Sequence, residues 1–517
     1  MESGAQKKGI YKFLDWVEKV GNKLPSPFML FVILMVFTMV LSMVLSWAGL
    51  SVTYYTGVGG ELTQTTVTVQ NLLSREVLTD IISRFTSIYV GFAPLGLVLV
   101  MMMGIGLVEH TGLISALMRK TLLGAPPALV TIVLAFVGVN ANLASDAGMI
   151  FAAAMGGALY KALGRNPKLG IVVGFAASSG GFTANILIAG TDGLLAGITQ
   201  TVAEGSGIVF NVNPAMNWYF MLVATFVVTG VTAFIAEKVT AKSLAHEVIE
   251  VDETELKKHE LTPEENRGLR AAGIALLVYV ALLLVALVPE DGFLRGPDGG
   301  VLQSPFMSGI VAIIFFFFVS TGIAYGIAAG AIKGEGDIAR FMQKSVTGAA
   351  PFLVVALAAS MFIQMFNASG LTAIIAVNGA EFIGGLGIGI IPLSISFILL
   401  TAFINLFTIS GSAKWLILAP VFVPMFAMMG ISPAFTQVAY RIGDSATNII
   451  SPLSPLLPVI IGIFDQYKRK EDPPAGFGTV ISYALPYSIA YMVTLTLLLI
   501  AFILLGLDVG PGAPIFF

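Results

Sequence analysis

The sequence contains no cysteine, only three histidines and few charged residues. Without cysteine there can be no disulfide framework, no thiol chemistry and no thiolate metal site. His110, His246 and His259 fall in no HExxH pattern, so we expect no transition-metal centre and no cofactor. The chain also lacks a GxxxxGK[ST] phosphate-binding loop, which disfavours a transport ATPase. Ser410 and Ser412 have no histidine base in the apolar segments, so we expect no enzyme activity.

Charged residues make up 11% of the 517 residues and hydrophobic residues 56%, far from the balance of a soluble globular protein. Several apolar runs reach the roughly 20 residues that a transmembrane helix needs. The sequence therefore predicts an all-α polytopic membrane protein. Its expected partners are the lipid bilayer and a small-molecule substrate, and no nucleic acid.

Apolar runs and their interruptions predict nine transmembrane helices and two re-entrant helical hairpins. The predicted spans are residues 27–48, 88–110, 168–190, 216–237, 270–288, 306–332, 347–366, 433–463 and 478–505, and the hairpins are 126–160 and 388–429. The predicted units are a cytoplasmic amphipathic N-terminus (1–26), a first scaffold span (27–50), a first transport unit (88–237), a cytoplasmic charged linker (238–269), scaffold or dimerisation spans (270–332) and a second transport unit (347–505). Residues 51–86 are polar and threonine-rich before they become amphipathic.

The two transport units share matched features. Asn142 and Asn185 are 43 residues apart, and so are Asn405 and Asn448. A glycine precedes the second asparagine of each pair by five residues, and a Gly-x-x-Pro turn recurs between the asparagines with a displacement of three residues. Paired, interrupted apolar segments in two halves of a chain indicate a binding site near the middle of the membrane.

The distribution of basic residues predicts the orientation of the chain. Of the 27 lysines and arginines, 22 fall in loops that this layout places in the cytoplasm. Arg75, Arg84 and Arg295 lie outside, and Lys414 and Arg441 lie within the membrane. This predicts a cytoplasmic N-terminus, a periplasmic C-terminus and a bacterial inner-membrane location. The two hairpins then enter from opposite sides, which is an inverted-topology repeat suited to alternating access.

Polar oxygens gather at both predicted hairpin tips, where helix ends and freed carbonyls face the middle of the membrane. Hard oxygen ligands of this kind suit Na⁺. The alternative is that these side chains only cap the broken helices. The candidate Na⁺ ligands are Asn142, Ser145, Asp146 and Asn185 in the first unit and Thr408, Ser410, Thr447 and Asn448, beside Asn405, in the second.

Charged residues in an apolar segment are costly and usually mark a site or pathway. Arg441 and Asp444 are spaced to pair on one helix face, either as a structural ion pair or as a substrate-carboxylate ligand and a cation relay. Asp192 is either a second acidic residue that relays a cation or only a loop residue at the outer interface of the membrane. Trp415 either stacks on an aromatic substrate or packs in the protein, and Lys414 beside it can simply extend its amine toward the membrane surface.

The segments NLFTISGSAKW and YRIGDSATNIISPLSP resemble the AbgT family of p-aminobenzoyl-glutamate transporters, which includes sulfonamide exporters. The resemblance covers essentially the whole chain. It implies a fold similar to the sodium-coupled dicarboxylate transporters, within an ion-transporter superfamily, and a bowl-shaped homodimer. Carried over by motif, it implies that the transport residues are Asp192, Asn405, Trp415, Pro433, Arg441, Asp444 and Pro452. Family members differ in direction and coupling ion, so Na⁺ and H⁺ both stay open.

The sequence thus predicts a secondary transporter of p-aminobenzoyl-glutamate or a related aromatic compound of the folate pathway, with sulfonamide efflux as one form. One alternative is a sodium-coupled dicarboxylate symporter. Another, from a different class, is an ion channel, whose currents would far exceed the turnover of a carrier.

Overall fold

The computed structural model describes Trp16, Val20 and residues 23–58, 61–182, 184–244, 254–257, 259–408, 410–468 and 475–517. Most of the predicted amphipathic N-terminus (1–26), and residues 245–253 and 258 of the predicted linker, lie outside the described residues.

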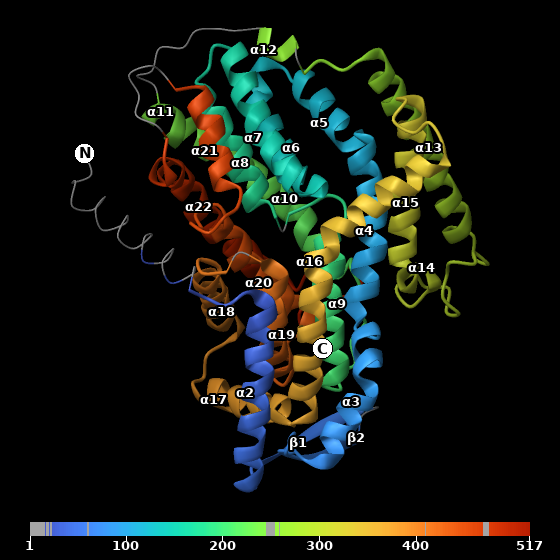
Figure 1. The fold of residues 1–517 in the computed structure, drawn as a ribbon, viewed down its shortest axis with the longest axis vertical. Helices are drawn as coiled ribbons and strands as arrows, with labels where there is room; N and C mark the ends of the chain where they lie inside the picture. Colours follow the sequence, from blue (N-terminus) through green and yellow to red (C-terminus); the bar gives the residue numbers. More distant parts are fainter. Residues whose placement is uncertain are drawn as a thin grey trace.

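In the part of the chain that the structure describes, the elements are helices apart from one pair of strands (Figure 1). The strands are β1 (Ser51–Val58) and β2 (Glu61–Thr68). The helices are α2 (Pro27–Trp47), α3 (Arg75–Val90), α4 (Ala93–Thr111), α5 (Leu113–Leu123), α6 (Val130–Asn140), α7 (Ser145–Ala162), α8 (Pro167–Gly180), α9 (Gly190–Gly205), α10 (Trp218–Ile235), α11 (Ala241–Ser243), α12 (Thr254–Lys257), α13 (Pro263–Leu287), α14 (Pro305–Ser308), α15 (Ile310–Ala328), α16 (Glu335–Ala368), α17 (Leu371–Gly385), α18 (Ile390–Asn405), α19 (Gly411–Ala427), α20 (Pro433–Asn448), α21 (Leu457–Gln466) and α22 (Phe477–Leu505).

Among the described residues, eight helical stretches are long and apolar enough to cross a membrane. The predicted spans 168–190 and 433–463 are not among them, because each is interrupted: α8 ends at Gly180 and α20 at Asn448. The polytopic helical architecture is therefore confirmed, while the count of nine spans stays a prediction.

The strands β1 and β2 are an addition to the predicted all-α fold. They pair antiparallel, from Ser51 opposite Thr68 to Val58 opposite Glu61. Their threonine, valine and tyrosine residues favour extended backbone, and the hydroxyls of Thr53 and Thr66 lie 2.8 Å apart across the pair. Hydropathy alone indicates only a polar connection in this stretch, because hydropathy does not report strand propensity.

Both predicted hairpins fold back on themselves. In the first, the hydroxyl of Thr131 in α6 lies 2.5 Å from that of Tyr160 in α7. In the second, the rings of Phe397 in α18 and Phe422 in α19 are 4.5 Å apart. The structure places α6 and α7 in the half of the molecule that holds α12, and α18 and α19 in the half that holds the β-strands (Figure 1). The two helix pairs thus point toward the middle of the molecule from opposite ends.

The broken helices α8 and α20 begin in the same way. A glycine with left-handed backbone, Gly164 (φ 68°) or Gly430 (φ 77°), reverses the chain just before each helix. The side chains of Asn166 and Ser432 then accept a backbone N–H in the first turn, and a proline occupies the first helical position. The recurring Gly-x-x-Pro pattern therefore codes for the same local structure in both units.

The helices α7 and α8 approach each other at backbone distance because glycines face one another. A Cβ atom built on Gly170 would lie 2.0 Å from the carbonyl oxygen of Gly156, and one on Gly174 would lie 2.2 Å from that of Ala152. Since no side chain fits between them, these two helices pack as closely as small-residue interfaces in membranes allow.

We expect Gly170→Ala to destabilise the protein. Overpacking costs roughly 1–3 kcal/mol, which exceeds the gain of about 1 kcal/mol that alanine brings to a helix. Gly230→Ala in α10 is the matched control, because nothing lies within 4 Å of the added methyl group. Thermal unfolding in detergent should show a lower midpoint for Gly170→Ala alone. Equal midpoints for the two variants would contradict the backbone contact.

Candidate functional site

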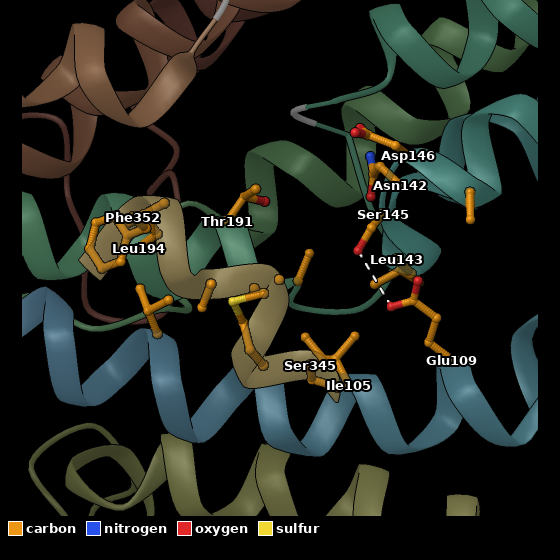
Figure 2. A pocket seen from close by; sticks show the side chains of 18 of the residues that line it. Ile105, Glu109, Asn142, Leu143, Ser145, Asp146, Thr191, Leu194, Ser345 and Phe352 are labelled. Atoms are coloured by element: carbon orange, nitrogen blue, oxygen red, sulfur yellow. Dashed lines mark hydrogen bonds between the residues drawn. The ribbon is translucent and has the colours of Figure 1, made fainter. Parts of the chain in front are cut away.

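A cavity of about 560 Å³ lies beside the turn that joins α6 to α7 (Figure 2). Figure 2 shows Asn142, Ser145 and Asp146 on one side of it, with Glu109 of α4 next to Ser145. The helix α16 closes the cavity with Ser345 and Phe352, and the start of α9 contributes Thr191. The remaining lining residues are Val98, Met102, Ile105, Gly106, His110, Leu143, Ala147, Met149, Phe182, Ala189, Gly190, Leu194, Lys344, Gly348 and Ala349.

The turn of the first helix pair (140–146) is tightly held. Ser145 has φ 52°, the one positive value of a non-glycine residue in the described part of the chain. Such backbone costs of order 1–3 kcal/mol and persists where the surroundings determine it. The Ser145 hydroxyl lies 3.5 Å from a carboxylate oxygen of Glu109 (Figure 2). The turn is therefore fixed from both sides, by the helix pair and by α4.

Asn142 in this turn and Asn185 in the connection between α8 and α9 have amide atoms without partners. Asn142 donates from Nδ2 to the carbonyl oxygen of Gly181, at 2.9 Å, but its buried Oδ1 accepts no hydrogen bond. Asn185 is fully buried, and neither its Nδ2 nor its Oδ1 has a protein partner. Because a buried amide without a partner costs about 1–3 kcal/mol, this place is suited to a bound group that supplies the missing contacts.

The turn of the second helix pair (405–411) has the same capping bond. Asn405 donates from Nδ2 to the carbonyl oxygen of Asp444, at 2.7 Å, and it also reaches Thr447 and Asn448, each at 2.9 Å. The acceptor lies 39 residues after the asparagine in both turns. Asn142 and Asn405, the first members of the two asparagine pairs found in the sequence, are therefore structural counterparts. Asn405 Oδ1, unlike its counterpart in Asn142, accepts a hydrogen bond from Lys414 Nζ.

Four charged side chains are buried between the two units and form two ion pairs. Asp192 in the first turn of α9 pairs with Arg441 of α20, and Lys414 of α19 pairs with Asp444 of α20. Each of these residues is at most 2% exposed. The Asp192–Arg441 pair links residues 249 positions apart, one from each unit. Asp192 also accepts the backbone N–H of Ala189 at 2.6 Å, which positions its carboxylate.

These pairs correct three predictions. Arg441 and Asp444 do not pair with each other, although they are spaced i, i+3, because each faces a different neighbouring helix. Lys414 does not extend toward the membrane surface, because the Asp444 carboxylate holds its amine in the core. Asp192 is not a loop residue at the outer interface, because it begins a buried helix.

Trp415 is enclosed by protein in this conformation. Its ring packs on Tyr440 with 4.6 Å between centroids, and its Nε1 donates to the Thr199 hydroxyl at 2.9 Å. Thr199 in turn donates to Gln437 at 2.6 Å. Trp415 is fully buried and does not line the cavity, so the packing alternative describes its state here.

Sequence reasoning missed several residues of this network. Asn217 Oδ1 accepts from Gln437 Nε2 at 2.8 Å and from Arg441 Nη1 at 3.4 Å. Gln437 lies one helical turn before Arg441, a spacing that could have drawn attention to it. No sequence signal indicates Asn217 or Thr199, because they come from elements far away in the chain.

The remaining predicted residues shape the backbone. Pro433 occupies the first turn of α20, and Pro452 lies in the break between α20 and α21. Ser410 caps α19 by accepting the backbone N–H of Ala413, and it is exposed. Thr408 is half-buried and lies in the connection between α18 and α19. Ser410 therefore fits the capping alternative that the sequence left open.

The cavity and the buried ion pairs are neighbours. Phe182 lines the cavity. Its Cε1 would lie 3.5 Å from a Cβ atom built on Gly411 in the second turn. The same Cβ position is 3.3 Å from a carboxylate oxygen of Asp444. Asn142, Ser145 and Asp146 line the cavity, whereas Asp192, Arg441 and Asp444 do not. Phe182 therefore contacts the cavity on one side and the second turn on the other.

Two helix pairs that point inward from opposite ends, two interrupted helices and ion pairs buried at their junction define an integral membrane transporter. A family model described as the AbgT putative transporter family matches residues 12–517, and the chain belongs to this family. The predicted resemblance is confirmed. The relatives are named as transport proteins, so the predicted class, a transporter and not an enzyme, is confirmed as well.

Relatives match over nearly the whole chain. The p-aminobenzoyl-glutamate transport protein of Escherichia coli (strain K12) is 37% identical over 502 residues, which are 97% of this chain and 96% of that protein. The Alcanivorax borkumensis YdaH transporter, whose crystal structure has an unusual topology, is 35% identical with a TM-score of 0.86, over 94% of this chain and 100% of that chain. Neisseria gonorrhoeae MtrF, whose structure illuminates a class of antimetabolite efflux pumps, is 39% identical with a TM-score of 0.90, over 97% and 100%.

We expect Asp192→Ala to destabilise the protein by roughly 3–5 kcal/mol, because it leaves the Arg441 guanidinium buried without a counter-charge. The double variant Asp192→Leu/Arg441→Met should be less destabilised than Asp192→Ala, because no charge is then left unpaired. Denaturant unfolding in mixed micelles measures both. Asp80→Ala, which breaks the half-exposed pair with Arg84, is the control and should change nothing measurable. A double variant no more stable than Asp192→Ala would contradict this account.

Proposed function

We propose that this chain is a secondary transporter of p-aminobenzoyl-glutamate or related aromatic compounds of the folate pathway, sulfonamides included, driven by an ion gradient. The observation that carries the proposal is the pairing of Asp192 and Arg441 across the two units. In alternating access the two units move relative to each other, so the Asp192–Arg441 contact between them can be replaced by a contact with the substrate. The name of the E. coli relative supports the substrate class.

The substrate carboxylate takes the place of Asp192 on Arg441. A planar guanidinium fork can bind a carboxylate through two parallel hydrogen bonds. Arg441 makes one hydrogen bond to Asp192, from Nη2, and its buried Nε has no partner. p-Aminobenzoyl-glutamate has two carboxylates for such exchange and an aminophenyl ring. The ring lies against Trp415 once the packed pair with Tyr440 opens. Sulfonamides share the ring and lack the glutamate, so their recognition depends more on Trp415.

The coupling ion in this proposal is Na⁺ at the first turn. The unpartnered Oδ1 atoms of Asn142 and Asn185 supply hard oxygen ligands, and Ser145 and Asp146 are the further predicted ligands there. The rival is H⁺, carried by Asp192 and Asp444 as a relay. Protonation of Asp192 would release Arg441 to the substrate, which suits exchange of substrate against protons.

The arrangement in the membrane is part of the same proposal. Nine spans and two re-entrant hairpins, with the N-terminus in the cytoplasm and the C-terminus in the periplasm of a bacterial inner membrane, agree with the distribution of lysine and arginine. The chain acts as a homodimer through the scaffold spans 270–332. In support, α13 is apolar, mostly exposed and set apart at the edge of the molecule (Figure 1).

Reconstituted protein should move radiolabelled p-aminobenzoyl-glutamate in proteoliposomes under an imposed Na⁺ or proton gradient. Arg441→Lys should reduce this flux at least tenfold, because a lysine offers no bidentate fork. Flux that succinate supports and aminobenzoyl-glutamate does not would favour a dicarboxylate symporter instead. Currents far above carrier turnover, with no substrate counterflow, would favour an ion channel.

We expect Asn185→Leu to raise the Na⁺ concentration for half-maximal transport about tenfold, since one lost ligand worth about 1.4 kcal/mol corresponds to that factor. Leucine keeps the volume of the buried side chain and removes its oxygen. Asn378→Leu, at an exposed position of α17, is the matched control. Unchanged Na⁺ dependence in Asn185→Leu, with normal expression, would remove Na⁺ from the first turn and favour H⁺.

A further inference from the structure

The two turns differ in one respect: the first has unpartnered amide oxygens and the second does not. Asn142 and Asn405 are structural counterparts, since each caps the carbonyl 39 residues later. The buried Asn142 Oδ1 accepts no hydrogen bond. Asn405 Oδ1 accepts one from the Lys414 ammonium, which also contacts Asp444. The same oxygen position is thus satisfied by a cation in one unit only.

The sequence explains this difference. Lys414 follows Asn405 by nine residues. The residue nine positions after Asn142 is Phe151, an apolar and partly buried side chain. The position that corresponds to Asp444 is Gly181, which has no side chain to offer. At these two positions the second unit therefore carries a cation and an anion, and the first unit carries neither.

The ammonium occupies a set of ligands that would suit a free cation. It contacts one amide oxygen and one carboxylate oxygen, both from residues at most 1% exposed. Amide and carboxylate oxygens are the ligands that hard cations prefer. An ammonium and a Na⁺ ion carry the same charge, so one can replace the other at such a place without changing the net charge of the core.

We propose that the Lys414 ammonium is a tethered cation that occupies the second turn at the place corresponding to the Na⁺ site of the first. The chain then has one exchangeable cation site instead of two. In the wild-type protein Thr408, Ser410, Thr447 and Asn448 bind no free Na⁺, because the oxygens of Asn405 and Asp444 beside them are taken. The comparison with the first turn rests on the proposed function, whereas the occupation of the second turn rests on the Lys414 contacts alone.

Removing the amine should create a Na⁺ site. The test measures the thermal unfolding midpoint of purified protein against Na⁺ concentration, with choline chloride keeping the ionic strength constant. Lys414→Ala should start lower than wild type without Na⁺ and recover as Na⁺ is added, with a dependence steeper by about one bound ion per chain. Lys414→Ala/Asp444→Asn should lose this added dependence, because the carboxylate that would attract Na⁺ is gone.

Lys242→Ala is the matched control, because it removes an exposed lysine of α11 and should follow the wild-type curve. Equal Na⁺ dependence in Lys414→Ala and wild type overturns the proposal. Binding of two ²²Na⁺ ions per wild-type chain overturns it too. So does failure of Lys414→Ala to accumulate in Na⁺-rich medium, since the ion should then replace the amine. A wild type without Na⁺ response, beside a responsive Lys414→Ala, refutes Na⁺ at the first turn and leaves this inference standing.

Discussion

The structure depends on the rule that a charge inside a membrane protein needs a counter-charge or a polar partner close by. Asp192, Lys414, Arg441 and Asp444 obey it in two pairs, and these pairs determine how α9, α19 and α20 face one another. Neutral hydrogen bonds through Thr199, Gln437 and Asn217 continue the same junction. The two units are therefore held together at the centre by polar contacts in a largely apolar molecule. One partner of a polar contact can be replaced by another group of the same charge or hydrogen-bonding capacity. Packed apolar side chains offer no such replacement.

The sequence was sufficient for the larger plan. Apolar run lengths and Gly and Pro interruptions place the first helix pair within a few residues of its predicted bounds 126–160, and the second, predicted as 388–429, equally closely. Matched spacing of asparagines also identified the counterpart positions. The sequence did not predict which charged residues pair with each other. Arg441 pairs with a residue 249 positions away, while the nearby Asp444 pairs with a lysine of another helix. Spacing along one helix describes which face a side chain occupies, and only the neighbouring helices decide what it meets there. Trp415 shows the same limit, because its burial is set by Thr199 and Tyr440.

The cavity and the buried ion pairs occupy different places in this conformation, because none of the four paired residues lines the cavity. The cavity opens along the first turn, while Arg441 does not line it and is paired with its own counter-ion, Asp192. A substrate in the cavity would face asparagine, serine and carboxylate groups together with Lys344, and would reach Arg441 only after the junction rearranges. In the proposed exchange at Arg441, the Asp192–Arg441 pair must break before the substrate carboxylate binds, so the stability of this pair would lower the affinity for an anionic substrate.

The glycine contact between α7 and α8 restricts how such a rearrangement can occur. At Gly156 and Gly170 backbone lies against backbone, so one helix cannot slide along the other there without first separating from it. In the proposed alternating access, α7 and α8 would therefore move together as one rigid unit. The relative movement would then occur on the other side of the first turn, where the turn faces α4 and α16 across the cavity. In this unit, the surface that would change during transport is therefore the one that faces α4 and α16. A covalent cross-link between α7 and α8 should leave the transport cycle intact.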